Sequence, residues 1–323
     1  MGKSVKRVIV ICGPTASNKT DFAHRLALEI GADLVGVVNA DSMQIYKQIP
    51  IITSSPSKQL QEKLGYYLYN FLDVNRYFSV DLYCKTAIDV IKNLSNLGST
   101  AILVSGSGMY INSLIYGYHN IPSIELNVKQ EAKYLYDKFG REVVFNILCK
   151  KDPLLKTRIN INDSQRICRA YEVLLQTGSS ILDFYQERYK ISSLKDFTLD
   201  VIMLLPERNY LYDLCRHRLY NMFSDNLVIE EIRSLLDNFG VINNPAIHAL
   251  GIKEIIAYLQ HKISLEKAIE LIFIRTKQYA KRQITWFSNK LRPKQIINFS
   301  DNREYLANSS ISIKKISDNL KNK

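Results

Sequence analysis

The sequence predicts an α/β protein: a P-loop-type parallel sheet flanked by helices, with an inserted all-helical module and a helical C-terminal region. Short apolar runs rich in β-branched residues alternate with segments whose apolar residues recur at helical spacing, which is typical of a parallel sheet covered on both faces. Only helical patterns occur between about residues 122 and 196, and again from residue 207 onward. A glycine-containing loop typical of phosphate binding follows the first apolar run.

These patterns divide the chain into four parts. Residues 1–119 form the first part of the α/β core, and residues 120–198 form the helical insertion. Residues 199–308 complete the core and add the C-terminal helices. The last segment, 309–323, is polar and basic, and we expect it to fray.

Each predicted strand ends at turn-forming or polar residues. The strands are expected at residues 8–12, 34–38, 101–104 and 201–205. The clearest helical patterns cover residues 21–30, 79–96 and 264–286.

Composition excludes several classes of protein. Hydrophobic residues make up 46% of the 323 residues and charged residues 23%, which rules out intrinsic disorder. No apolar run approaches the ~18 residues of a membrane span. The 43 basic residues against 31 acidic ones give a net charge of +12, which favours a polyanionic partner. The five cysteines show no C-x-x-C spacing, so free thiols in a reducing compartment, the cytoplasm, are the expectation. Nothing in the sequence demands more than a monomer.

The loop after the first strand has the frame G-x-x-x-x-G-K-[ST]. Gly13, Lys19 and Thr20 hold their places, and Asn18 stands where the pattern has glycine. Backbone N–H groups and Lys19 would hold phosphate oxygens, and the Thr20 hydroxyl could reach Mg²⁺. Asparagine tolerates positive φ, so we expect Asn18 to adopt the conformation of the motif glycine. A turn that binds nothing is the alternative. The predicted phosphate-binding residues are Gly13, Pro14, Thr15, Ala16, Ser17, Asn18, Lys19 and Thr20.

Further polar motifs follow the next strands. Residues 41–47 follow the second strand and residues 105–110 follow the third, at the sheet edge where doubly wound folds bind ligands. Three more motifs occur later, at residues 163–170, 249–254 and 281–287.

In this order, the motifs resemble the tRNA dimethylallyltransferase family, also called tRNA isopentenyltransferases, over about residues 8–290. The blocks at 41–47 and 281–287 are the most specific. The resemblance implies transfer of a dimethylallyl group from dimethylallyl diphosphate to N6 of adenosine 37, next to the anticodon of tRNA. It also implies that the phosphate loop, with Mg²⁺, holds the diphosphate of the donor rather than ATP.

The resemblance also implies roles for single residues. Asp41 matches the family's general base, which suits a weakly nucleophilic exocyclic amine. Ser107 aligns with a threonine that contacts the reacting end of the substrates, and Arg218 matches an arginine near the diphosphate.

The target adenine must leave the base stack to react, so we expect it in a channel that leads to the diphosphate. In the family, the helical insertion grips the anticodon stem-loop. Trp286, the only tryptophan, is interpreted as core packing more readily than as a stacking platform. The positions that match tRNA-contacting ones are Asp41, Ser42, Met43, Gln44, Ser107, Lys129, Gln165, Arg166, Ile167, Cys168, Arg169, Lys253, Lys281, Arg282, Gln283 and Trp286.

The chain departs from the family pattern at several positions. A lysine usual in the segment 52–56 is absent, and the family's His-His pair and following aspartate are Tyr66, Tyr67 and Asn70. Three alternatives to an active tRNA enzyme therefore stay open. They are a tRNA-binding relic with an impaired donor site, an adenylate isopentenyltransferase that acts on a free nucleotide, and a small-molecule kinase.

Overall fold

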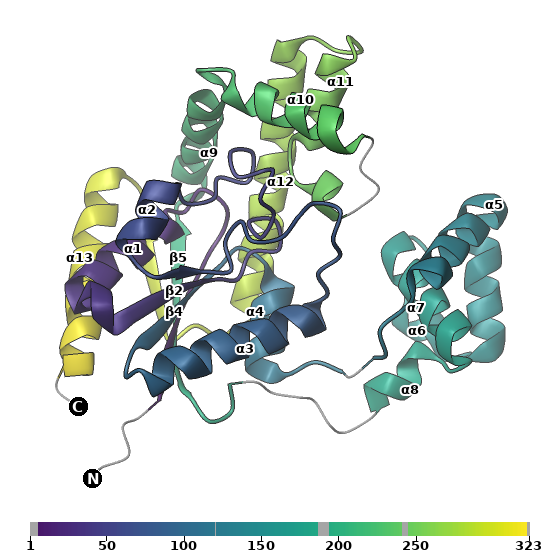
Figure 1. Ribbon diagram of the computed structural model, residues 1–323, viewed down its shortest axis with the longest axis horizontal. Helices are drawn as coiled ribbons and strands as arrows, with labels where there is room; N and C mark the ends of the chain where they lie inside the picture. Colours follow the sequence, from purple (N-terminus) through teal and green to yellow (C-terminus); the bar gives the residue numbers. More distant parts are fainter. Residues whose placement is uncertain (1–5, 120, 187–193, 241–244, 322–323) are drawn as a thin grey trace. The chain divides into compact units, whose positions relative to one another are not determined.

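The computed structural model describes residues 6–119, 121–186, 194–240 and 245–321. The chain forms two compact units (Figure 1). The first comprises Met1–Ile115 and Ser193–Lys323, and the second comprises Tyr116–Ser192. The second unit corresponds to the helical insertion predicted for residues 120–198. It begins and ends a few residues before those predicted bounds.

The first unit is built on a six-stranded, wholly parallel sheet in the order β3-β2-β4-β1-β5-β6. The strands are β1 (Arg7–Cys12), β2 (Val35–Asn39), β3 (Tyr66–Tyr67), β4 (Thr100–Ser105), β5 (Thr198–Pro206) and β6 (Gln295–Phe299). All four predicted strands are confirmed.

The two edge strands, β3 and β6, were not predicted from the sequence. β3 has only two residues, which is too short for a periodic pattern. β6 has five residues, and the expectation that the chain is helical beyond residue 207 is wrong there. Its exposed and buried positions alternate as on an edge strand, and it directly follows a long helix.

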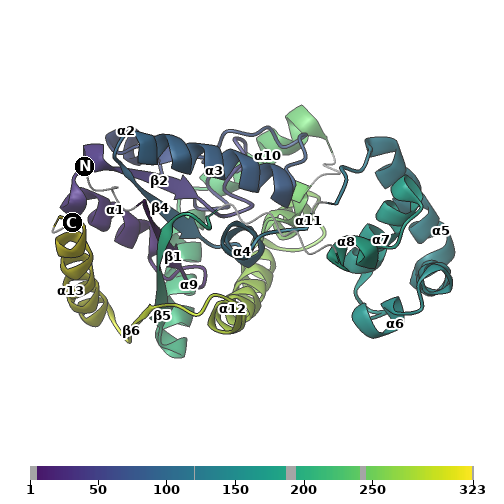
Figure 2. The same cartoon turned by 90° about the horizontal axis from the view of Figure 1, so that it is seen from below.

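Two helices cover one face of the sheet, α1 (Lys19–Ile30) and α13 (Asn302–Lys321). Ile9 and Ile11 of β1 pack on this face with Phe22 of α1 and Ile313 of α13. Figure 2 shows the sheet edge with β5, β6 and α13 from below. The helix α3 (Val80–Asn96) packs on the opposite face, where Leu94 lies directly over Gly36.

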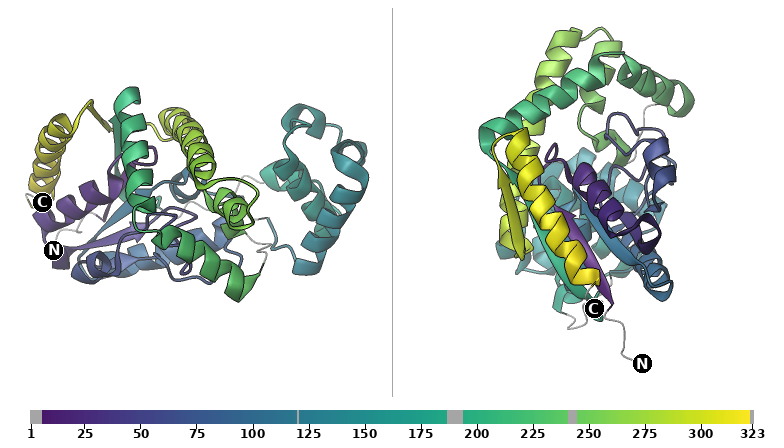
Figure 3. Two further views of the ribbon diagram at one scale, coloured as in Figure 1. Left: turned by 90° about the horizontal axis from the view of Figure 1, so that it is seen from above. Right: turned by 90° about the vertical axis from the view of Figure 1, so that its left-hand side faces the viewer.

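The predicted fraying of residues 309–323 is wrong for the described residues, because α13 continues to Lys321. Ser309, Ser312 and Ser317 are buried against the rest of the unit although they are polar. Small hydroxyl side chains allow α13 to approach α1 closely, and the two helices lie side by side (Figure 3). The basic residues noted from the sequence, such as Lys314 and Lys315, lie on the exposed side.

The remaining helices of the first unit surround the carboxyl ends of the strands. Side chains of α9, α10, α11 and α12 form one apolar cluster with Ile45, Ile49 and Ile52 of the loop after β2. These helices fix that loop above the sheet edge. Their bounds, with those of the two short helices α2 and α4, are Arg208–Phe223 (α9), Leu227–Phe239 (α10), Ile252–Leu259 (α11), Leu265–Lys290 (α12), Lys58–Lys63 (α2) and Gly108–Tyr116 (α4).

The second unit has its own core, formed by residues such as Val144, Leu148 and Ile167. Its longest helix, α5, contains Gly140 at φ 78°, a left-handed conformation that interrupts the helix. The Asp163 carboxylate accepts a hydrogen bond from the Arg166 N–H at 3.1 Å and so caps α7. The helices in the described part of this unit are α5 (Leu126–Lys151), α6 (Leu155–Arg158), α7 (Ser164–Thr177) and α8 (Ile181–Gln186).

Candidate active site

A cavity of about 1110 Å³ lies at the carboxyl ends of β1, β2 and β4. Because these strands are neighbours and parallel, the loops that follow them meet at one edge, as ligand sites of doubly wound sheets do. The structure therefore brings together the two motifs that were predicted to be catalytic and phosphate-binding. The predicted site residues that line the cavity are Thr15, Ala16, Ser17, Asn18, Lys19, Thr20, Asp41, Gln44, Arg218 and Gln283.

The phosphate loop has the backbone conformation that its sequence predicts. A Cβ on Gly13 would lie 2.5 Å from the Leu204 carbonyl oxygen of β5, so no other residue fits there. Asn18 adopts φ 60° and ψ 26°, the left-handed conformation expected for the motif glycine. The first N–H groups of α1 have no partners within the helix, so the loop presents donors and a positive helix end to the cavity.

Two cations lie beside these donors. The Lys19 ammonium donates to the Pro14 carbonyl oxygen across the loop at 2.6 Å. Arg218 of α9 donates to the Thr15 hydroxyl at 2.9 Å and to the Thr53 carbonyl at 3.3 Å. Burial lowers the pKa of Lys19 to about 8, while the charge of Asp41 opposes this effect and that of Arg218 adds to it. Burial also lowers the pKa of Arg218. Such a desolvated pair of cations is suited to an anionic ligand.

The carboxylate of Asp41 is held in place by its own loop. Its Oδ1 accepts a hydrogen bond from the Met43 N–H at 2.9 Å, and its backbone N–H donates to Asn39 Oδ1 at 2.8 Å. Asn39 is fully buried and also donates to the carbonyls of Asp41 and Leu68. Asp41 therefore has a fixed backbone while part of its carboxylate faces the cavity.

Ser107 connects the loops after β2 and β4. Its hydroxyl accepts a hydrogen bond from the Ser42 N–H at 2.9 Å and lies 3.0 Å from the Ser42 hydroxyl. The two serines were predicted to contact the substrates. In the structure they hold the two loops together, and neither is among the residues that line the cavity. The predicted contact residue Gln44 uses its amide to donate to the carbonyls of Thr53 and Ser54.

Helix α12 connects the phosphate loop with the loop after β4. Gln283, which is buried, accepts from the Thr15 N–H at 2.7 Å and donates to the Gly106 carbonyl at 2.7 Å. Tyr279, one turn earlier, donates to the same carbonyl at 3.3 Å. The amide predicted to contact tRNA thus bridges the phosphate loop and the loop after β4.

Gly106 lies directly against Asp41. A Cβ at this position would overlap Asp41 Oδ2. We expect Gly106→Ala to displace the carboxylate and to lower kcat by about 100-fold, since a misplacement of about 1 Å can cost that much. Steady-state turnover would be measured beside thermal unfolding. A variant that folds like the wild type and turns over within twofold of it would contradict this placement of Asp41.

The other predicted residues of the first unit lie outside this cavity. Lys253, Lys281 and Arg282 are exposed on α11 and α12, where a polyanion can reach them. Trp286 is half-buried and packs so closely over Gly108 that a Cβ there would overlap its ring. The ring thus packs on α4 without belonging to a buried core, and its contact with tRNA stays a prediction.

The predicted tRNA-contacting residues of the second unit lie on α5 and α7. Gln165 and Arg166 are exposed, and Lys129, Cys168 and Arg169 are half-exposed. The prediction that the side chain of Ile167 contacts tRNA is wrong, because this side chain is fully buried in the core of this unit. Arg166 and Arg169 form ion pairs with Asp163 and Glu172 on their own helix.

Several residues that shape the site were not predicted. Glu231 of α10 accepts hydrogen bonds from the Ile51 and Ile52 N–H groups at 2.7 and 2.9 Å, and so fixes the loop that carries Thr53. Burial raises the pKa of Glu231 to about 7. No pattern in the sequence indicates that α10 contacts residue 51. Tyr279, in contrast, precedes Gln283 by four residues, and this spacing places both on one helix face.

Lys58, at the start of α2, also lines the cavity. The segment 52–56 lacks the lysine that is usual in the family. Lys58, two residues after this segment, places a cation in the cavity. Asn70 donates to the hydroxyl of Ser55 at 3.1 Å and to the Tyr46 carbonyl. The segment that lacks the lysine and the position of the family's aspartate are thus joined by a neutral hydrogen-bonded pair, Ser55 and Asn70.

The donor set for a metal is sparse. Among the described residues, no group of three or more His, Cys, Asp or Glu side chains could hold a metal ion. Thr20 and Asp41 nevertheless line one cavity with the phosphate loop. Mg²⁺ commonly uses one or two protein oxygens together with substrate phosphates, and this donor set fits that mode. Of the described helices, none is long and apolar enough to cross a membrane.

Fold and site together define an α/β protein with a phosphate-loop motif and a cavity lined by a carboxylate and two cations. Residues 44–290 match the family model described as IPP transferase, and the chain belongs to this family. It is 43% identical over 304 residues to a tRNA dimethylallyltransferase of Rickettsia bellii, covering 93% of this chain and 94% of that one.

Solved structures agree with these matches. A full-length tRNA isopentenylpyrophosphate transferase from Bacillus halodurans has a TM-score of 0.65 at 27% identity, covering 98% of this chain and 100% of that one. A eukaryotic dimethylallyltransferase acting on tRNA has a TM-score of 0.79 at 25% identity, covering 95% of this chain and 77% of that one.

Proposed function

We propose that this protein transfers a dimethylallyl group from dimethylallyl diphosphate to N6 of adenosine 37 in tRNA. The observation that carries the proposal is the position of Asp41 in the same cavity as Lys19, Arg218 and the start of α1. A diphosphate held by the loop would leave its allylic carbon in the cavity that Asp41 lines. The family and the names of its relatives support tRNA as the acceptor.

In the reaction, the bond between the allylic carbon and the diphosphate oxygen breaks, and a bond from that carbon to N6 forms. Asp41 accepts the proton that N6 loses. The loop N–H groups, Lys19 and Arg218 stabilise the charge that develops on the leaving diphosphate. We propose that the Thr20 hydroxyl would hold Mg²⁺, which would neutralise further charge on the diphosphate.

The acceptor can be tested directly. With dimethylallyl diphosphate and Mg²⁺ present, unmodified tRNA and adenosine monophosphate would be supplied in separate reactions, and the nucleosides analysed by mass spectrometry. We expect the dimethylallyl mass gain on the tRNA alone. A gain on the free nucleotide would favour the adenylate isopentenyltransferase. A separate reaction with ATP and no dimethylallyl diphosphate tests the kinase, which phosphate transfer from ATP to a small acceptor would favour.

The alternative of a tRNA-binding relic with an impaired donor site depends on whether Asn18 changes the shape of the phosphate loop. Because Asn18 already adopts the left-handed conformation, the loop keeps its shape without glycine. We expect Asn18→Gly to leave KM for the donor within about fivefold of the wild type, since such a backbone change is worth at most about 1 kcal/mol. Steady-state kinetics at saturating tRNA would measure this. A large rise in KM would show that the asparagine side chain itself contacts the donor.

We also propose that the protein acts in the cytoplasm as a monomer. Its five cysteines are all free, and four of them are buried, as suits a reducing compartment.

A further inference from the structure

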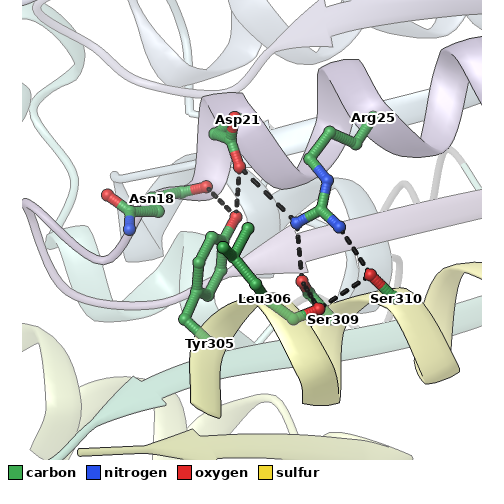
Figure 4. A network of polar contacts seen from close by, with 7 residues as sticks. All are labelled: Asn18, Asp21, Arg25, Tyr305, Leu306, Ser309 and Ser310. Carbon is green, nitrogen blue, oxygen red and sulfur yellow. Dashed lines mark hydrogen bonds and ion pairs between the residues drawn. The ribbon is translucent and has the colours of Figure 1, made fainter. Parts of the chain in front are cut away.

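The helix α13 reaches the phosphate loop through one hydroxyl group. Tyr305 is only 2% exposed, and its hydroxyl donates to Asp21 Oδ2 at 2.6 Å (Figure 4). Asp21 follows Thr20 directly, in the first turn of α1. The same hydroxyl lies 3.4 Å from the Asn18 carbonyl oxygen, which accepts the first helical hydrogen bond of α1 from Phe22 at 2.9 Å. Tyr305 therefore sits where the phosphate loop becomes a helix.

Asp21 is a negative charge in an unfavourable place for an anionic ligand. It lines the cavity together with Asn18 and Lys19, and its side chain is 52% exposed. A carboxylate free to turn toward a bound diphosphate would repel it. The hydrogen bond from Tyr305 directs one carboxylate oxygen toward α13.

Arg25 completes this arrangement. Its guanidinium lies 3.9 Å from Asp21 and donates to the hydroxyls of Ser309 and Ser310, each at 2.7 Å. Both serine hydroxyls donate in turn to the Leu306 carbonyl, which leaves their lone pairs facing Arg25. The guanidinium is thereby fixed beside the carboxylate.

The ring of Tyr305 has a fixed position because it packs on Phe299 of β6 at a centroid distance of 5.0 Å. Phe299 and Tyr305 belong to the apolar cluster that also contains Phe22 of α1. The hydroxyl is thus placed by the core and not by a mobile surface side chain.

We propose that Tyr305 is a positioning residue for the donor diphosphate: its hydroxyl holds the Asp21 carboxylate away from the phosphate loop and fixes the turn that starts α1. This inference rests on the proposed function, because it takes the diphosphate as the ligand of the loop. It gives α13, a segment outside the matched residues 44–290, a part in donor binding.

The test is Tyr305→Phe, which keeps the ring and removes the hydroxyl. We expect KM for dimethylallyl diphosphate to rise about tenfold, the size expected for loss of one hydrogen bond to a charged group, while kcat and tRNA affinity stay within twofold. Tyr210→Phe is the matched control, since Tyr210 packs on the same Phe299 ring from α9. An unchanged KM, or a fall in kcat alone, would overturn the proposal.

A double variant separates positioning from general destabilisation. If Tyr305 acts by restraining the Asp21 charge, Asp21→Asn should remove the penalty, and Tyr305→Phe in that background should leave KM unchanged. Additive effects would contradict the mechanism. Binding of inorganic diphosphate by calorimetry gives a readout that needs no turnover. A wild type that binds diphosphate more tightly than Tyr305→Phe but never modifies tRNA would overturn the proposed function and leave this inference standing.

Discussion

Replacing Asp41 by asparagine is expected to lower kcat by about 100- to 10,000-fold, the contribution typical of a general base. Asparagine keeps the oxygen that accepts the Met43 N–H and changes little in volume, so the loop after β2 should keep its shape. What is lost is the ability to take the proton from N6. The affinity for tRNA should stay within about twofold, because phosphate contacts elsewhere provide most of the binding free energy.

Single-turnover rates and equilibrium tRNA binding would be measured on the same preparation. Asp81→Asn, at the start of α3, is the matched control, since Asp81 pairs with Lys85 on its own helix. The control should match the wild type in both measurements. A kcat for Asp41→Asn within a few-fold of the wild type would exclude Asp41 as the base.

Replacing Lys19 by alanine should lower kcat/KM for dimethylallyl diphosphate by about 100- to 1,000-fold, as loss of one preorganised donor to a developing anion does. Lys267→Ala removes an exposed lysine that pairs with Glu270 on α12, and it should have no effect. A loss of less than fivefold for Lys19→Ala would contradict the assignment of the loop to the diphosphate.

The pH dependence gives a second measure of the same lysine. With its pKa near 8, Lys19 is charged below that value and neutral above it. Binding of the diphosphate should therefore weaken as the pH rises through 8 in the wild type, and this part of the profile should be absent in Lys19→Ala. Calorimetric titrations of donor between pH 7 and pH 9 would show it.

The central strands and the meeting of the loops after β1, β2 and β4 could be predicted from the sequence, because buried parallel strands give continuous apolar runs and end at one edge. The left-handed conformation of Asn18 could be predicted as well, since the motif requires it. These features depend on local patterns.

The unpredicted features depend on packing between distant segments. The sequence of α13 is polar enough to indicate a frayed tail, yet Ser309, Ser312 and Ser317 are buried because α13 packs against α1, where Ser309 accepts a hydrogen bond from Arg25. Ile167 stands within a motif associated with RNA contact, but its place on the inner face of α7 puts it in the core. Glu231 acts on residues 51 and 52, about 180 positions away, which no local pattern reveals.

The most direct test of the account is to locate the modified nucleotide. Wild-type protein, dimethylallyl diphosphate and Mg²⁺ would be incubated with an unmodified tRNA that has adenosine at positions 36 to 38, and nuclease fragments of the anticodon loop analysed by mass spectrometry. We predict one dimethylallyl group, on adenosine 37, with one diphosphate released for each. Modification elsewhere, or none on a tRNA that the protein binds in a salt-dependent way, would contradict the assignment of this cavity.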